Sequence, residues 1–128
     1  MIFVDTNYFL RFILRDVEDQ YRIAKQLFTQ AVQTKIKLFT SLLVIFEIYW
    51  VLRTFYGKEK NEIPRVLGKI CQLDFIEFEG RMIFVEALSF YQKSNLDLVD
   101  SYNLILAKSK GITEFKTFDA KLARAFIG

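Results

Sequence analysis

Short segments of strand-like composition alternate with longer helical patterns along the chain, and this order constrains the fold more than any other feature. Four runs have the length of short strands and lie at residues 1–4, 37–40, 75–78 and 114–118. Segments with the three- to four-residue periodicity of helices separate them. Strands that alternate with helices through short connections are typical of an α/β fold around a mostly parallel sheet.

The helical patterns have recognisable ends. Ser41 can cap the helix that follows it, and Pro64 suits the start of the next one. The helix after Ser41 is expected to end at Gly57 or in the charged stretch 58–62. The other expected helices cover residues 8–14, 18–32, 64–73, 82–93 and 99–108, with a short terminal helix opened by Asp119. In the helix at 18–32, Ile23, Leu27 and Ala31 recur at four-residue steps and predict its buried stripe. No linker, repeat or low-complexity tract divides the 128 residues, so we expect a single domain over 1–128.

Glu47 is the only charged side chain in the apolar run 42–52. On a helix it shares a face with apolar neighbours such as Trp50, which places it toward the core or a cleft. Because burial of an unpaired carboxylate costs several kcal/mol or more, Glu47 is expected to be paired, protonated or bound to a metal. Arg53 and Arg81 are the alternative partners within the chain.

The composition excludes several kinds of active site. The chain has no histidine, which removes histidine-assisted nucleophiles and histidine zinc sites. Its single cysteine, Cys71, allows neither an internal disulfide nor a cysteine-built zinc site. No glycine-rich phosphate loop is present. An enzyme of this composition has to work with carboxylates, hydroxyls, amides and basic groups, and oxygen-rich sites of that kind suit Mg²⁺ or Mn²⁺.

The acidic residues fall at informative places on the predicted scaffold. Asp5 follows the first strand and Asp119 follows the last, at the sheet edge where ligands bind in open α/β folds. Asp100 lies in the first turn of a helix, with Asp97 just before it. Together with Glu47 these carboxylates can converge, and their mutual repulsion favours a divalent cation. The alternative is that the aspartates only cap helices or complement helix dipoles.

Four segments of the chain resemble the PIN-domain nucleases, and within them the small VapC-type toxins. They are Phe3-Val4-Asp5-Thr6-Asn7, Ser41 through Glu47 to Leu52, Asp97-Leu98-Val99-Asp100-Ser101, and Thr117-Phe118-Asp119. Their order and spacing cover the chain nearly from end to end. Tyr102 and Asn103 depart from the pattern, in which small residues usually follow the aspartate of the third segment.

The resemblance implies a three-layer α/β/α sandwich and a ribonuclease that hydrolyses RNA phosphodiester bonds with Mg²⁺ or Mn²⁺. The implied catalytic residues and metal ligands are Asp5, Glu47, Asp100 and Asp119. Polar support is expected from Thr6, Asn7, Asp97 and Thr117. One or two ions would activate water and neutralise phosphate charge.

The resemblance and the hydrophobicity together suggest partners. A chain that is 52% hydrophobic and holds fourteen phenylalanines is expected to offer an apolar surface for self-association or a bound peptide. We expect a homodimer neutralised by a small antitoxin, which lays an apolar helix in a groove and directs a basic side chain at the carboxylates. The net charge of +3 is compatible with RNA. Basic residues expected near the same sheet edge are Arg11, Arg15, Lys116, Lys121 and Arg124.

Three other functions fit the sequence less well. A receiver domain needs an aspartate after a central strand, where this chain has Ser41. A dehalogenase-type phosphatase needs two aspartates spaced by one residue after the first strand, and the second position here is Asn7. A non-catalytic interaction module would keep the fold and cleave nothing.

The sequence also bears on location. No uncharged stretch approaches the roughly 18 to 20 residues needed to cross a bilayer. Asp5 and Arg11 interrupt the apolar stretch near the N-terminus, so no secretory signal is expected. These features predict no membrane association and a cytoplasmic location.

Overall fold

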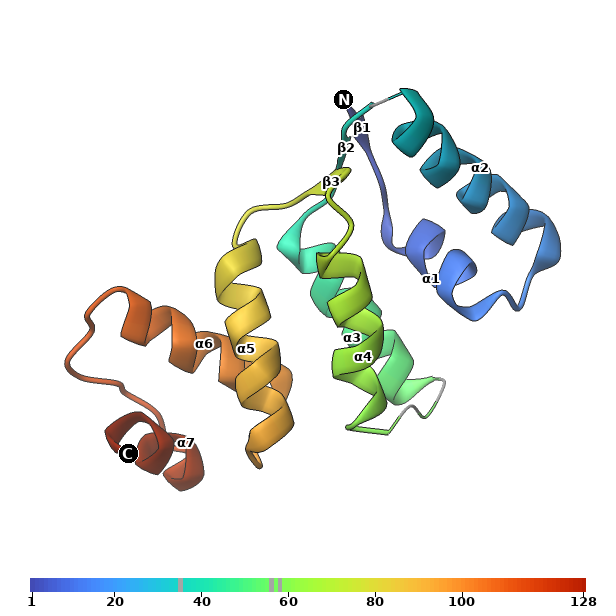
Figure 1. Cartoon of the computed structure of the whole chain (residues 1–128). Coiled ribbons are helices and arrows are strands. Elements are labelled where there is room, and N and C mark those ends of the chain that lie inside the picture. The colour runs from blue at the N-terminus through green and yellow to red at the C-terminus, as the bar shows by residue number, and fades with distance from the viewer. Residues whose placement is uncertain (35, 56, 58) are drawn as a thin grey trace. The chain divides into compact units, whose positions relative to one another are not determined.

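The computed structural model describes residues 1–34, 36–55, 57 and 59–128. The described chain forms two compact units, Met1–Glu79 and Gly80–Gly128, which are described separately below (Figure 1). The expectation of a single domain stays a prediction. No helix within the described residues is both long and apolar enough to cross a membrane.

The first unit contains a small parallel sheet. Strands β1 (Ile2–Phe3), β2 (Leu38–Phe39) and β3 (Ile76–Glu77) lie in the order β1-β2-β3, with both strand pairs parallel. Ile2 aligns with Leu38, and Leu38 with Ile76. The predicted parallel sheet is confirmed at these three positions, and the carboxyl ends of its strands share one edge.

Four helices connect these strands. They are α1 (Thr6–Leu14), α2 (Glu18–Thr34), α3 (Leu42–Thr54) and α4 (Glu62–Cys71). Helix α1 packs against α2 and α3, and α3 packs against α4 (Figure 1). Ser41 caps α3 as predicted, because its hydroxyl accepts a hydrogen bond from the Val44 backbone N–H at 3.1 Å. Pro64 lies in the first turn of α4, which begins two residues earlier than expected. Lys58, in the stretch expected to end α3, lies outside the described residues.

Thr40 fixes the sheet edge where α1 and α3 begin. It is fully buried, and its hydroxyl donates to the carbonyl oxygen of Val4 at 2.8 Å. Its backbone N–H donates to Glu77, and the Val4 N–H donates to Phe39. These bonds extend the ladder by one residue, so the positions of Asp5 and Ser41 follow directly from the sheet.

The core of the first unit is aromatic where α1 meets α2. Phe28 contacts Phe9 and Phe12, with ring centroids 5.7 and 5.0 Å apart. The buried stripe of α2 consists of Ala24, Phe28 and Ala31. Ile23, predicted to belong to this stripe, is instead 53% exposed. Helix α2 packs against α1 through the face that carries Phe28, so Ile23 lies on an exposed side of the helix.

The second unit is helical. It contains α5 (Arg81–Lys93), α6 (Leu98–Ser109) and α7 (Ala120–Ile127), with α6 packed against both α5 and α7. Buried Leu96, Leu104 and Leu122 join α6 to α7 and to the segment before α6. This small core therefore packs α7 against α6 and against the segment that precedes α6.

The predicted strand at 114–118 is wrong for this structure, which has no regular secondary structure there. No strand occurs among the described residues of the second unit, so this segment has no ladder partner within its own unit. Phe115 turns to the leucine core and contacts Phe126 at 5.3 Å between ring centroids, whereas Phe118 is fully exposed. The other predicted strands and helices are confirmed to within a few residues.

Candidate active site

Asp5 lies just beyond β1 and caps α1. Its backbone is extended, with φ −88° and ψ 170°, and its Oδ1 accepts a hydrogen bond from the Thr6 N–H at 2.8 Å. Thr6 is buried, whereas Asp5 and Asn7 are exposed. The capping interpretation of Asp5 is therefore confirmed. The same geometry places its carboxylate at the carboxyl edge of the sheet.

Glu47 is exposed, so the prediction that it points into the core is wrong for this structure. The buried face of α3 consists of Val44, Ile45, Ile48, Tyr49 and Leu52. Leu43 and Trp50, which share the face of Glu47, are 80% and 61% exposed. Because α3 is apolar on nearly all sides, the sequence pattern could not tell the buried face from the outer one. Among the described residues of its unit, Glu47 has no ion pair.

The second unit gathers three aspartates. Asp97 caps α6, and its Oδ1 accepts the Asp100 N–H at 2.8 Å. Asp119 caps α7, and its Oδ1 accepts the N–H groups of Lys121 and Leu122 at 2.9 and 3.2 Å. Both Asp97 and Asp119 repel the negative charge of Asp100. The packing of α6 on α7 thus brings residues from two sequence segments into electrostatic contact.

The pKa of Asp100 responds to this arrangement of carboxylates. Partial burial, followed by repulsion from Asp97 and then from Asp119, raises the pKa of the Asp100 carboxyl above its usual value. Lys121 acts in the opposite direction and only partly offsets the increase. Asp97, Asp100 and Asp119 are called the carboxylate cluster around Asp100 below, and Lys121 does not fully offset their repulsion at Asp100.

Asp5 and Asp119 each use only one of their two carboxylate oxygens for capping. The capping bonds of Asp5 and Asp119 all go to Oδ1. Within the part of the chain that the structure describes, Oδ2 of either residue accepts no hydrogen bond. Capping and ligand binding are consequently compatible, since each carboxylate can use one oxygen for the helix and the other for a cation.

Neighbouring polar groups hold the second-unit cluster in place. The hydroxyl of Thr117 accepts the Asp119 N–H at 3.0 Å, and the buried Ser101 hydroxyl donates to the Asp97 carbonyl at 2.7 Å. Lys121 donates through Nζ to the Asn95 carbonyl at 2.9 Å. The sequence indicated Lys121 as a phosphate contact and gave no sign that it is the cation beside Asp100. Its position two residues after a capping aspartate was the only available signal.

Three of the other basic residues expected near the RNA already have partners. Arg11 forms an ion pair with Asp16 at 2.8 Å, and Arg15 lies 4.4 Å from the centroid of the Tyr21 ring. Lys116 is paired with Glu114. Their expected contacts with RNA phosphates, like that of Arg124, stay predictions.

The Asp100→Asn protein is expected to melt at a higher temperature than the wild type at neutral pH. A carboxyl whose pKa is raised by folding stabilises the fold while it is protonated and loses that contribution as the pH rises through its folded-state pKa. The advantage of the amide should therefore be largest near neutral pH and vanish in acid. Thermal unfolding in EDTA from about pH 4 to about pH 8 measures it.

Glu86→Gln is the matched control, because Glu86 is an exposed acid on α5 with no part in the cluster. It should leave the melting temperature nearly unchanged at every pH. If Asp100→Asn behaved in the same way as this control, the proposed repulsion at Asp100 would be absent.

The donor chemistry of these residues fits a hard divalent cation. All the candidate ligands are carboxylates, and the cluster around Asp100 gains from added positive charge. Among the described residues, however, no three acidic, histidine or cysteine side chains stand close enough to form a ready metal-binding group. The structure supports the choice of ligand type and leaves the ligand set as a proposal.

Comparisons with known proteins establish the family. The model of the PIN domain family matches residues 2–126. The chain belongs to the PIN domain family. This membership confirms the predicted α/β/α class with its parallel sheet and the resemblance stated from the four segments. The PIN domain is also similar to a VapC ribonuclease of Aquifex aeolicus (strain VF5), with 27% identity over 124 residues, covering 97% of this chain and 91% of that protein. No solved structure matches this PIN domain.

Proposed function

We propose that this PIN domain is a metal-dependent endoribonuclease and the toxin of a toxin-antitoxin pair. The observation that carries the proposal is the repelling carboxylate cluster around Asp100, in a chain similar to a VapC ribonuclease. A solvent-accessible group of like charges destabilises its own fold, and a cation that binds RNA phosphates would offset that cost.

Asp5, Glu47, Asp100 and Asp119 are the proposed ligands of Mg²⁺ or Mn²⁺. When bound, such an ion lowers the pKa of a water molecule and neutralises charge on the phosphate. The chain's own contribution is orientation. The Thr6 N–H fixes the Asp5 carboxylate, and the first turn of α7 fixes that of Asp119. Thr6, Asn7, Asp97 and Thr117 are proposed as polar support for these ligands.

A cleavage assay with the full chain tests this function. Structured and single-stranded RNAs are incubated with the protein in Mg²⁺, in Mn²⁺ and in EDTA. We expect cleavage in either metal, loss of cleavage in EDTA, and recovery when excess Mg²⁺ is restored. Cleavage that persists in EDTA would contradict the metal requirement, and failure to cleave any RNA would favour the non-catalytic interaction module.

A groove in the first unit supports the proposed antitoxin partner. Its volume is about 660 Å³, and its apolar lining includes Phe9, Phe12 and Phe28. Arg65 and Lys69, one turn apart on α4, stand at its exposed rim. An apolar floor beside two cations is complementary to an amphipathic helix with acidic residues along its polar side.

The remaining partner and location expectations belong to the same proposal. Leu43 and Trp50 expose apolar surface on α3, which is compatible with the predicted homodimer. The elution volume in size-exclusion chromatography measures that state. A cytoplasmic location is part of the proposal, because the proposed RNA substrate is found there.

A further inference from the structure

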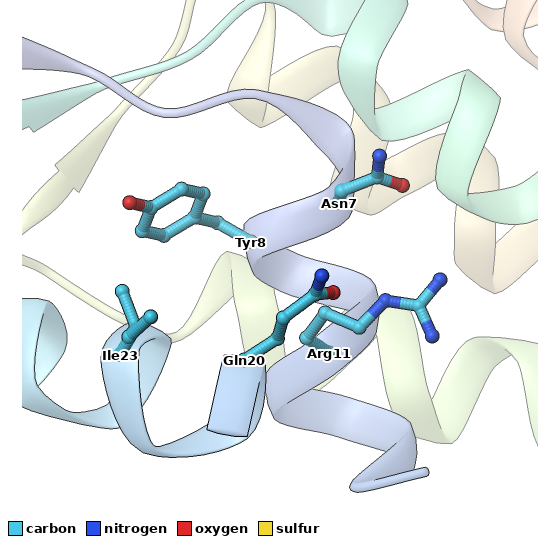
Figure 2. A pocket seen from close by; sticks show the side chains of 5 residues that line it. All are labelled: Asn7, Tyr8, Arg11, Gln20 and Ile23. Atoms are coloured by element: carbon cyan, nitrogen blue, oxygen red, sulfur yellow. The ribbon is translucent and has the colours of Figure 1, made fainter. Parts of the chain in front are cut away.

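A small pocket lies immediately beside the helix that Asp5 caps. Its volume is about 260 Å³, and its lining comes from α1 and α2 of the first unit. Figure 2 shows Asn7, Tyr8 and Arg11 projecting from α1, and Gln20 and Ile23 from α2. The first of these residues follows Asp5 by two positions, so whatever occupies the pocket lies near the start of α1.

The lining is balanced in charge. Arg11 donates from one guanidinium nitrogen to both carboxylate oxygens of Asp16, at 2.8 and 2.9 Å. Arg11 is the one cationic side chain among the described residues that line the pocket, and Asp16, in the connection between α1 and α2, neutralises it. A phosphate would have to compete with Asp16 for Arg11, whereas an uncharged group would not.

The neutral polar groups of the pocket are unused. Among the described residues, the side-chain amides of Asn7 and Gln20 and the hydroxyl of Tyr8 form no hydrogen bond. Each amide offers both a donor and an acceptor, as the edge of a nucleobase does. These groups can therefore pair with a base without breaking a hydrogen bond between described residues of the protein.

The ring of Tyr8 and the side chain of Ile23 supply the apolar part of the lining. Tyr8 is 39% exposed and Ile23 is 53% exposed, although both are large and hydrophobic. The exposure of Ile23 breaks the stripe predicted for α2, and its exposed side chain contributes to the pocket. An accessible phenol ring is a stacking platform for an unpaired base.

We propose that this pocket is a subsite for one unpaired nucleobase of an RNA strand, with Tyr8 stacking on the base and Gln20 reading its edge. The inference rests on the proposed ribonuclease function and adds to it the residues that choose the base. The size agrees, because the pocket is smaller than the roughly 300 to 1,000 Å³ of sites for drug-sized ligands.

RNA binding in EDTA tests the subsite apart from catalysis. The probes are fluorescein-labelled single-stranded RNA oligomers of uridine, adenosine or cytidine, and a copy of each with abasic positions. Fluorescence anisotropy compares the full-length wild type with Tyr8→Leu, Tyr8→Phe and Gln20→Ala. Gln26→Ala is the matched control, since Gln26 is also an exposed glutamine on α2 but lies outside this pocket. Circular dichroism verifies that each variant is folded.

Tyr8→Leu is expected to weaken binding of intact oligomers on the order of tenfold, whereas Tyr8→Phe keeps most of the affinity because its ring still stacks. Gln20→Ala should change the order of preference among the bases, and Gln26→Ala should change nothing. Tyr8→Leu should have little effect on abasic RNA, since there is no base to stack.

Three results would overturn the subsite. The first is unchanged affinity and base preference in Tyr8→Leu and Gln20→Ala, and the second is an equal loss for intact and abasic RNA. The third is absence of RNA binding by the wild type. RNA cleavage by the wild type with no effect of these variants would reject the subsite and keep the ribonuclease. Base-dependent binding without cleavage in any metal would keep the subsite and reject the ribonuclease.

Discussion

The Asp100→Asn protein is expected to remain folded and to cleave RNA at least about a hundredfold more slowly than the wild type, on the scale of losing one electrostatic contact to the transition state. Asn preserves the shape of the side chain and removes the charge that the proposed cation needs. The same change relieves repulsion by Asp97 and Asp119, so stability should rise while activity falls. Initial cleavage rates in Mg²⁺, compared with melting temperatures, measure both effects.

Asp97→Asn is the control for this prediction. Asn is as good a capping residue as Asp, so the variant should keep the N-terminus of α6 intact. Asp97 is proposed as polar support and not as a metal ligand. The RNA cleavage rate of Asp97→Asn should therefore fall much less than that of Asp100→Asn. Equal losses in the two variants would contradict the different roles given to these neighbouring residues.

Reversal of the groove's charges is expected to reverse its preference among peptides. Two synthetic amphipathic helices serve as probes, with the same leucine face and with either glutamate or lysine on the polar face. The wild type should prefer the acidic peptide, and a variant with both Arg65→Glu and Lys69→Glu should bind it on the order of tenfold more weakly. The double variant should gain affinity for the lysine peptide. Anisotropy titrations measure all four combinations.

Lys108→Glu is the matched control for the single substitution Lys69→Glu, since both lysines lie in the last turn of an α-helix and Lys108 lies outside the groove. Lys108→Glu should leave the peptide preference unchanged, whereas Lys69→Glu should weaken the acidic peptide. If the two single variants weakened the acidic peptide equally, the effect would reflect net charge and not a groove.

The sequence predicted local structure well where periodicity and capping agreed. Ser41, Asp97 and Asp119 each occupy the N-cap position of a helix, and each uses its side chain there. The segments 1–4, 37–40 and 75–78 were predicted as strands because each is short, contains adjacent apolar residues and is separated from the next by helices, and they contain the three parallel strands. Helix caps and short strand segments depend mainly on residues close in sequence, so they could be predicted from the sequence alone.

The failures have a common cause in tertiary packing. Glu47 lies on a helix with apolar residues on nearly every side, so the pattern did not reveal which face is buried. The segment 114–118 has strand-like composition, but a strand needs a neighbour to pair with, and Phe115 instead joins a leucine core. Ile23 fits a regular stripe, yet α2 is oriented by Phe28.

The sequence predicted which residues belong to the candidate site, but only some of the contacts between them. The charge contact of Asp100 with Asp119 requires α6 and α7 to pack, through Leu104 and Leu122 on the two helices. The role of Lys121 beside Asp100 depends on the same packing. Neither contact could have been deduced from spacing. The contact of Asp100 with Asp97, by contrast, is local to the N-terminus of α6.

A titration of Mn²⁺ binding by isothermal calorimetry tests the central claim most directly, with Asp5→Asn, Glu47→Gln, Asp100→Asn and Asp119→Asn measured beside the wild type. The claim predicts that the wild type binds Mn²⁺ and that each of the four variants binds it more weakly, while Asp97→Asn changes the affinity least. Unchanged Mn²⁺ affinity in Asp5→Asn and Glu47→Gln would contradict it, because the ligands would then come only from the cluster around Asp100.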